Sequence, residues 1–167
     1  MDIDLLPLRP EDVPQFKRDM QEAFQRGAAE MGESGDADEE VLPEADIDRS
    51  LSAQGAVSYK AVLDGEMAGG AIIVIDAATR RGELHFLYVR HGIQSRGIGQ
   101  AIWRAIEQRH PEVAVWETVT PAFEKRNIHF YVKCCGFAIV ECLTRRVTAR
   151  ARRRAGATRR VCSVFKR

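Results

Sequence analysis

The chain has 167 residues, of which 45% are hydrophobic and 29% are charged, and these values favour one globular domain that buries most of its apolar surface. No apolar run approaches the length of a membrane span, and the acidic start Met1-Asp2-Ile3-Asp4 is unlike the basic start of a signal peptide. We therefore expect a cytoplasmic protein. The four cysteines lack the paired C-x-x-C spacing of a zinc site, so we expect reduced thiols and no metal.

Charge is distributed unevenly along the chain. Residues 1–50 hold 15 Asp and Glu against 5 Lys and Arg, whereas residues 144–167 hold 10 basic residues and no acidic one. The basic run falls in an expected loop over about residues 145–158 and could meet nucleic-acid phosphates, but aromatic residues for base stacking are absent from it. We favour a solvated loop whose charge the acidic first third neutralises within the chain or across a homodimer.

The first half of the chain predicts a strand, two helices and a hairpin. Residues 3–8 predict the strand, and the segment after Arg9 opens a helix with apolar residues at helical spacing. Residues 27–46 are polar and acidic and predict a loop, followed by a short helix over about residues 46–54. The hairpin is expected over residues 59–63 and 68–75, because Asp64-Gly65 supplies the positive φ values of a tight turn.

The second half alternates strands and helices before a final hairpin. A strand over residues 82–90 leads into a helix with an apolar stripe that includes Ile98, Ile102 and Ile106. Residues 113–118 predict another strand, and Pro121 is expected to start a helix that reaches about Cys134. The last two strands are expected at residues 137–143 and 160–165, paired as a long hairpin.

The most informative segment is Gln94-Ser95-Arg96-Gly97-Ile98-Gly99, which lies between a predicted strand and a predicted helix. Glycines let the backbone approach a ligand closely, and the first N–H groups of a helix converge where its dipole favours negative charge. This arrangement is typical of a pyrophosphate-binding turn. Its spacing fits neither the dinucleotide fingerprint G-x-G-x-x-G nor the P-loop.

The segment resembles the Q/R-x-x-G-x-G/A signature of the GCN5-related N-acetyltransferase (GNAT) superfamily, which binds the pyrophosphate of acetyl-coenzyme A. Val89 stands five residues before Gln94, as in that family, and Phe130-Tyr131-Val132-Lys133-Cys134-Cys135-Gly136-Phe137 is similar to its second motif, F/L-Y-x-K-x-G-F. The resemblance implies one α/β (α+β) domain over residues 1–167. Its fold is a mixed sheet of six to seven strands with about four helices, splayed at the cofactor-binding strands.

The resemblance also implies how acetyl-coenzyme A is held. The main chain of Leu87 and Val89 is expected to bond the pantetheine amides as a further strand would. The backbone of residues 94–99 is expected to take the phosphates, and Arg96 adds a cation. Asn127 could replace the asparagine that relatives carry one turn earlier. The cofactor-binding residues are therefore predicted as Leu87, Val89, Gln94, Ser95, Arg96, Gly97, Ile98, Gly99 and Asn127.

Two residues on the strand before the glycine turn are candidates for the base that takes the amine proton. Glu83 and His85 stand where different branches of the superfamily carry a glutamate and a histidine base. By the two-residue period of a strand, both are expected on the same face as Leu87 and Val89. Whether Glu83, His85 or water accepts the proton stays open.

Tyr131 is the candidate that protonates the departing thiolate, since a phenol is protonated at pH 7. In many relatives the tyrosine precedes the Gly-Phe pair by four residues, whereas Tyr131 precedes Gly136 by five. A bulge at the helix end could absorb the extra residue, or the extra residue could turn the phenol away.

These residues predict an enzyme that moves an acetyl group from acetyl-coenzyme A to a primary amine of a small molecule or protein by direct transfer in a ternary complex. A small-molecule amine is the favoured acceptor. In the superfamily the segment between the first two helices forms one wall of the acceptor site, and the acidic loop around Glu33, Asp36, Asp38, Glu39 and Glu40 would attract an ammonium group. Acidity for solubility explains that loop equally well. The alternatives are a non-catalytic acyl-coenzyme A-binding regulatory domain and a nucleic-acid-associated protein that uses the basic segment.

Overall fold

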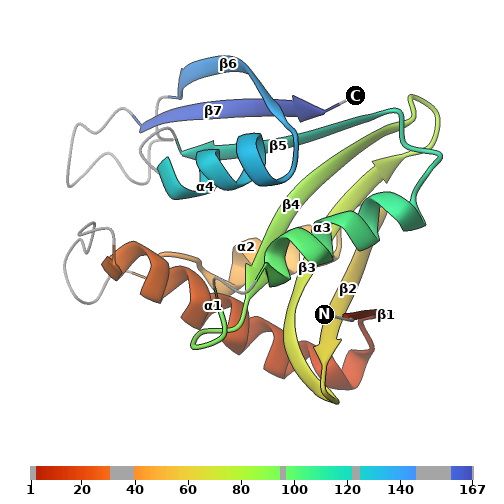
Figure 1. Ribbon diagram of the computed structural model, residues 1–167, viewed down its shortest axis with the longest axis vertical. Helices are drawn as coiled ribbons and strands as arrows, with labels where there is room; N and C mark the ends of the chain where they lie inside the picture. The colour runs from red at the N-terminus through yellow and green to blue at the C-terminus, as the bar shows by residue number, and fades with distance from the viewer. Residues whose placement is uncertain (1–2, 31–39, 95–96, 122–124, 146–158, 167) are drawn as a thin grey trace.

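Seven strands form one mixed sheet in the order β1-β2-β3-β4-β5-β7-β6 (Figure 1). The computed structural model describes residues 3–30, 40–94, 97–121, 125–145 and 159–166. The strands are β1 (Asp4–Pro7), β2 (Ala56–Leu63), β3 (Glu66–Asp76), β4 (Arg81–Val89), β5 (Val115–Pro121), β6 (Ala138–Arg145) and β7 (Arg159–Lys166). The helices are α1 (Val13–Glu30), α2 (Glu44–Leu51), α3 (Ile98–Arg109) and α4 (Lys125–His129), with a 3-10 turn η1 (Pro10–Asp12) and a π-helical turn η2 (Phe130–Cys134).

The contact between β4 and β5 is the one parallel pairing among the described strands, and it is short. Pairing runs from Arg81 opposite Val115 to Leu84 opposite Thr118, and the two strands then separate. Figure 1 shows them together at one end and apart at the other. A parallel pair needs a long crossover, and α3 supplies it. The expected mixed, splayed sheet is therefore confirmed.

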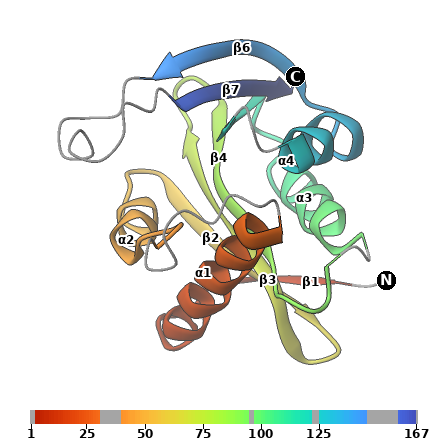
Figure 2. The same cartoon turned by 90° about the vertical axis from the view of Figure 1, so that its left-hand side faces the viewer.

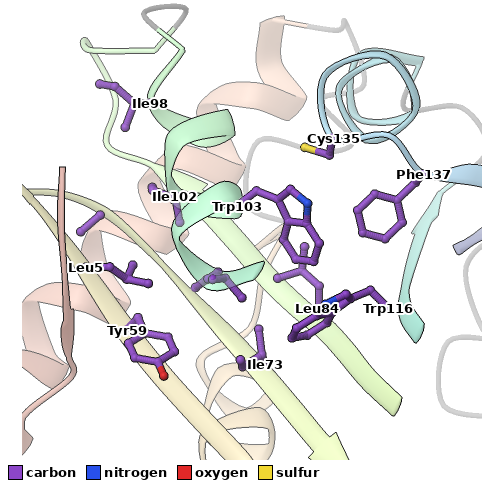
Figure 3. Close-up of a cluster of buried hydrophobic side chains, with 13 residues drawn as sticks. Leu5, Tyr59, Ile73, Leu84, Ile98, Ile102, Trp103, Trp116, Cys135 and Phe137 are labelled. Carbon is purple, nitrogen blue, oxygen red and sulfur yellow. The ribbon is translucent and has the colours of Figure 1, made fainter. Parts of the chain in front are cut away.

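Helices cover both faces of the sheet (Figure 2). On one face, α1 and α2 bury a cluster that includes Phe16, Met20 and Ile47 against β3 and β4. On the other face, α3 buries a larger cluster (Figure 3). In it the Trp103 ring packs edge-on against Trp116, with ring centroids 5.2 Å apart, and the centroids of Trp103 and Phe137 are 5.0 Å apart. The second cluster joins α3, β5 and the segment after η2, so it sets the position of α4 beside the splayed strands.

The β2–β3 hairpin has the turn that its sequence predicts. Asp64 and Gly65 both adopt positive φ, 53° and 82°. Two positive φ values in a two-residue loop match the right-handed twist of the flanking strands. The final hairpin is also confirmed, because β6 pairs with β7 in antiparallel fashion. β7 lies between β5 and β6, an order that the hairpin alone does not determine.

Several predicted boundaries are wrong, three of them at helices. α1 continues through Gly27 to Glu30, so helix replaces the start of the expected loop at residues 27–46. A single glycine costs a helix only about 1 kcal/mol, which the burial of Phe16 and Met20 on the same helix offsets. α2 covers Glu44–Leu51 instead of residues 46–54. Pro121 ends β5 instead of starting a helix, since a strand end tolerates a residue without an N–H.

Parts of the two expected charged loops lie outside the described residues. These parts are residues 31–39 of the acidic loop and residues 146–158 of the basic loop. Within the part of the chain that is described, none of the helices has the length and apolar character that crossing a lipid bilayer requires.

Gly82 tests the packing between β4 and β5. A Cβ at this position would lie 2.4 Å from Cζ3 of Trp116, so we expect Gly82→Ala to lower the free energy of unfolding by about 1–3 kcal/mol. Gly27→Ala is the matched control, because nothing lies within 4 Å of its added Cβ and alanine favours the helix. It should raise stability by about 0.5–1 kcal/mol. Urea denaturation measures both, and equal effects of the two variants would contradict the packing described.

Candidate functional site

The turn between β4 and α3 begins the helix with a left-handed glycine. Gly97 is the N-cap of α3 with φ of 76°, and its carbonyl accepts the N–H of Ala101 at 3.0 Å. A Cβ on Gly97 would meet open space, so glycine is needed here for its backbone angle and not for room. The N–H groups of the first helical turn have no carbonyl partner within the helix. Ser95 and Arg96 lie outside the described residues.

The side chain of Gln94 braces this turn. Its Oε1 accepts the N–H of Gly92 at 2.9 Å, and its Nε2 donates to the Val89 carbonyl at 3.5 Å. The amide is therefore engaged with the end of β4 and with the first part of the turn that follows it. Gln94 therefore shapes the start of the loop.

Close packing joins the start of α3 to the π-helical turn. A Cβ on Gly99 would lie 3.2 Å from two ring atoms of Phe130 and 3.6 Å from Cγ2 of Val89. Next to it, Gln100 Nε2 donates to the Cys134 carbonyl at 2.7 Å. Glycine at position 99 thus lets η2 approach both the helix start and the end of β4.

A β-bulge in β4 overturns the predicted alternation of side chains. Ile72 of β3 pairs with Phe86, but Ile73 pairs with Leu84, so His85 is an extra residue in the strand. The bulge reverses the phase of the pleat. Leu87 and Val89 pack against the α3-side cluster, whereas His85 bonds to α2 on the opposite face. The expectation that Glu83 and His85 share a face with Leu87 and Val89 is therefore wrong.

His85 is held between two side chains. Its Nδ1 lies 3.0 Å from Oγ of Ser50 in α2, and its Nε2 lies 3.2 Å from Oε2 of Glu83. A pocket opens beside this group, lined by residues of α2 and of the bulge: Asp46, Arg49, Ser50, Ala53, His85 and Phe86. The structure brings the two predicted base candidates together at the wall of a pocket. Ser50 was not predicted, and its separation of 35 residues from His85 leaves no local sequence signal.

Tyr131 lies in the π-helical turn η2. The N–H of Cys135 bonds to the Phe130 carbonyl at 3.1 Å, the five-residue spacing of a π turn. The residue that separates this motif from the usual spacing is thus absorbed as a bulge at the helix end, one of the two predicted outcomes. The Tyr131 ring packs edge-on against Phe130 and Phe137, with centroid distances of 5.3 and 5.7 Å. Asn127 lies in α4, just before this turn.

Two threonines of β5 lie where the strands part. Thr118 Oγ1 donates to the Leu84 carbonyl at 2.9 Å, at the last paired position. Thr120 is only 3% exposed, and its hydroxyl has no hydrogen-bond partner among the described residues. Buried hydroxyl groups normally have a hydrogen-bond partner. In the sequence, Thr118 and Thr120 alternate with Val119. This alternation was the signal that could have pointed to the two threonines.

Burial raises the pKa of two ionisable groups where β4 packs against α1. It raises the pKa of Tyr88, whose hydroxyl donates to Sδ of Met67 at 3.5 Å, and the nearby Asp19 carboxylate raises it further. Burial also raises the pKa of Asp19, an effect that its hydrogen bond with Gln15 opposes. Tyr88 therefore stays protonated at neutral pH and serves as packing on the α1 side. No group of His, Cys, Asp and Glu suited to a metal ion occurs among the residues described.

A strand that ends at a glycine-capped helix, beside a parallel neighbour that diverges, is the arrangement implied by the motifs at residues 94–99 and 130–137. Residues 15–137 match the Acetyltransferase (GNAT) family. The chain belongs to this family. The predicted resemblance is thereby confirmed over most of the chain.

Relatives of this GNAT protein include one with clear sequence similarity. The chain is 44% identical over 131 residues to the uncharacterized protein YrkN of Bacillus subtilis (strain 168). The aligned region covers 78% of this chain and 70% of YrkN. Solved structures share the fold at lower identity. The ribosomal-protein-S18-alanine N-acetyltransferase of Escherichia coli superposes with a TM-score of 0.71 at 15% identity, covering 98% of this chain and 92% of that one.

Two further solved structures contain coenzyme A. The spermidine N-acetyltransferase of Vibrio cholerae, in complex with coenzyme A and spermine, has a TM-score of 0.69 at 13% identity and covers 98% of this chain and 94% of its own. The PaiA N-acetyltransferase of Thermoplasma acidophilum, in complex with coenzyme A, has a TM-score of 0.66 at 17% identity and covers 98% of both chains. At these identities the likeness establishes the shared fold.

The two threonines provide a matched test of the parting strands. Thr118→Val removes the donor to the Leu84 carbonyl and should lower the free energy of unfolding by about 1 kcal/mol. Thr120→Val removes a buried hydroxyl without a partner among the described residues and should leave stability within about 0.5 kcal/mol of the parent or raise it. Urea denaturation without ligand measures both. A larger loss in Thr120→Val than in Thr118→Val would contradict the hydrogen bonding described.

Proposed function

We propose that this GNAT protein transfers an acetyl group from acetyl-coenzyme A to a primary amine by direct transfer in a ternary complex. The observation that carries the proposal is the gap between β4 and β5, which opens next to the glycine-capped start of α3. Three features at this gap fit a bound coenzyme: the unpaired edge of β4, the left-handed Gly97 and the buried hydroxyl of Thr120.

The cofactor contacts predicted from the family fit these positions. The main chain of Leu87 and Val89 lies in the part of β4 beyond its pairing with β5, so it offers hydrogen-bonding groups to the pantetheine arm. The N–H groups at the start of α3 suit the pyrophosphate, which a helix dipole also favours. When bound, the coenzyme supplies the activated acetyl group, and the protein orients it.

The acceptor amine is proposed to enter from the α2 side. Asp46 and Arg49, which bond to each other, line the pocket at the bulge together with His85. Glu83 bonds to His85, so its carboxylate lies next to the place where an ammonium group would lose its proton. Glu40, the described member of the acidic loop, accepts a hydrogen bond from Gln21 of α1 at 2.6 Å. Solved neighbours named for an alanine of a ribosomal protein and for spermidine share this fold, and both acceptors are amines.

A screen of amines for thiol release tests the proposed activity. Purified protein with acetyl-coenzyme A and a panel of polyamines, aminosugars, amino acids and lysine peptides should release free coenzyme A with at least one class, in proportion to the acetylated amine. Tight binding of acetyl-coenzyme A with no release on any amine would contradict catalysis and support the non-catalytic binding alternative.

Gly97→Asp tests the proposed pyrophosphate site. The variant places a Cβ and a negative charge at the helix start, so the affinity for acetyl-coenzyme A should fall at least tenfold, or about 1.4 kcal/mol. Gly65→Asp is the matched control, because Gly65 also has a left-handed φ of 82° and open space around its added Cβ. Isothermal titration calorimetry measures both dissociation constants. An unchanged dissociation constant in Gly97→Asp would contradict the proposed pyrophosphate site.

Tyr131→Phe tests the proposed proton donor. The variant keeps the ring contacts with Phe130 and Phe137 and removes the hydroxyl, so folding and cofactor affinity should hold while kcat falls by roughly 10- to 1,000-fold. Steady-state kinetics under conditions where chemistry limits turnover measures this. Full kcat would show that water protonates the thiolate, and loss of acetyl-coenzyme A binding would make Tyr131 a wall of the cofactor channel.

A further inference from the structure

Ser50 contacts the proposed site from a helix that carries none of the predicted catalytic residues. It is 8% exposed, and its hydroxyl lies 3.0 Å from Nδ1 of His85. The same imidazole reaches Oε2 of Glu83 with Nε2 at 3.2 Å. Ser50, His85 and Glu83 thus form a chain from a buried helix face to an exposed carboxylate.

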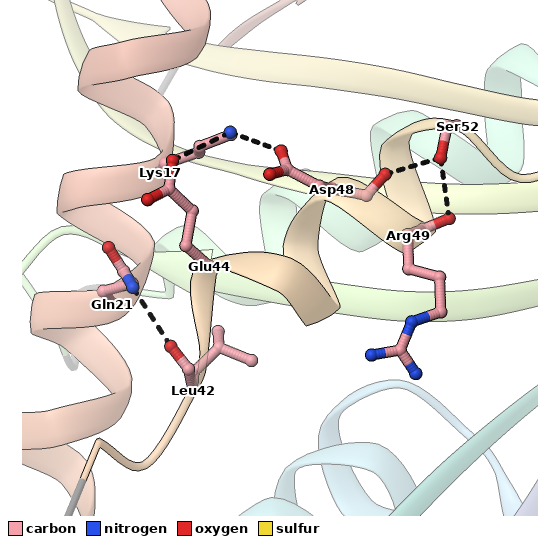
Figure 4. Close-up of polar contacts among 7 residues, drawn as sticks. All are labelled: Lys17, Gln21, Leu42, Glu44, Asp48, Arg49 and Ser52. Atoms are coloured by element: carbon pink, nitrogen blue, oxygen red, sulfur yellow. Dashed lines mark hydrogen bonds and ion pairs between the residues drawn. The ribbon is translucent and has the colours of Figure 1, made fainter.

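α2 is fixed to α1 by ion pairs (Figure 4). Lys17 of α1 bonds to Glu44 at 3.0 Å and also to Asp48, and these two carboxylates raise the pKa of its ammonium, the Asp48 bond most. Ile47 of α2 is fully buried in the core beneath the helix. These contacts hold the Ser50 hydroxyl against the bulge of β4.

Hydrogen-bonding capacity determines which ring nitrogen of His85 carries the proton. An ionised carboxylate can only accept, so the nitrogen that faces Glu83 must donate, and neutral His85 is the Nε2–H tautomer. Nδ1 then carries a lone pair, which accepts the Ser50 hydroxyl. This assignment comes from the hydrogen-bond partners. Both nitrogens are engaged, and an amine could reach Nδ1 only by displacing Ser50.

We propose that Ser50 is a positioning residue that holds His85 in the Nε2–H tautomer, so that His85 orients the Glu83 carboxylate as the base. The proposal rests on the proposed amine acetylation. In that reaction the amine nitrogen bonds to the acetyl carbon, the C–S bond of acetyl-coenzyme A breaks, and the thiolate that leaves takes a proton from Tyr131 or water. One N–H bond of the amine breaks and its proton passes to Glu83, directly or through one water, while His85 stays neutral and donates to the same carboxylate. The role of base is thereby assigned to Glu83, and His85 becomes a second positioning residue.

Other charged groups around His85 leave this assignment intact. α2 contributes Asp46 and Arg49, which bond to each other. On β5, Glu117 lies opposite Glu83 and pairs with Arg81 at 3.5 Å. Each of these groups has a partner of opposite charge. Glu83 is the carboxylate that bonds to the imidazole itself.

Nitrogen NMR of the histidine rings tests the positioning role without any turnover. In the parent protein at pH 7.5, His85 should show one Nε2–H tautomer, with the signal assigned by its loss in His85→Asn. Ser50→Ala should give a tautomer mixture, and Ser50→Thr should restore the single form. Ser52→Ala is the matched control, because the Ser52 hydroxyl bonds to the Asp48 carbonyl of the same helix and should leave His85 unchanged. A parent Nδ1–H tautomer, or a Ser50→Ala spectrum equal to the parent's, would overturn the proposal.

Kinetics on an amine found by the screen tests the consequence for Glu83. Ser50→Ala should lower kcat/KM for the amine about three- to tenfold, the range that one neutral hydrogen bond supports, and should change the acidic limb of the pH profile while KM for acetyl-coenzyme A stays constant. Ser50→Thr should recover most of the loss. A uniform fall at every pH, or an acetyl group on Ser50 by mass spectrometry, would overturn the positioning role. If no amine is turned over but the tautomer changes as expected, the proposed acetyl transfer fails while the control of His85 by Ser50 stands.

Discussion

The short parallel contact between β4 and β5 is the constraint on which the rest of the structure depends. Four residue pairs join the strands, and the contact then ends at Leu84 and Thr118. Parallel neighbours need a crossover helix, and α3 has to start beyond the free end of β4 and return along the sheet. The divergence therefore leaves hydrogen-bonding groups of β4 next to the N-terminus of a helix, and both can serve one elongated, anionic ligand.

The bulge at His85 divides the work of β4 between the two faces of the sheet. Beyond the bulge, Leu87 and Val89 pack on the α3 side, while His85 contacts α2. β4 thus has main-chain groups at the gap, in the plane of the sheet, and polar side chains at the pocket on the α2 face. Two helices with different partners complete the arrangement: α3 packs through Trp103, and α2 is tied to α1 through Lys17.

The π turn at η2 adapts the second motif to this frame. With one extra residue before Gly136, an ordinary α-helix would leave Phe137 out of phase with the cluster around Trp103. The wide turn absorbs the residue, and the Phe137 N–H bonds to the Tyr131 carbonyl at 2.9 Å. Phe137 therefore stays 3% exposed in the core, and Tyr131 stays beside it. Gly99 at the start of α3 also helps η2 to pack closely, because its missing side chain leaves room for the Phe130 ring.

The sequence by itself determined the order of the elements, the Asp64-Gly65 turn, the glycine-capped helix and the family, because these depend on local spacing and backbone preference. It placed Glu83 and His85 correctly on their strand but on the wrong face, since a bulge arises from pairing with β3 and has no local signature. Only the tertiary structure decided that Ser50 meets His85, that Thr120 is buried beside the gap and that β7 enters between β5 and β6. Each of these contacts joins segments whose sequence separation hides them from periodicity, and packing of the whole sheet brings them together.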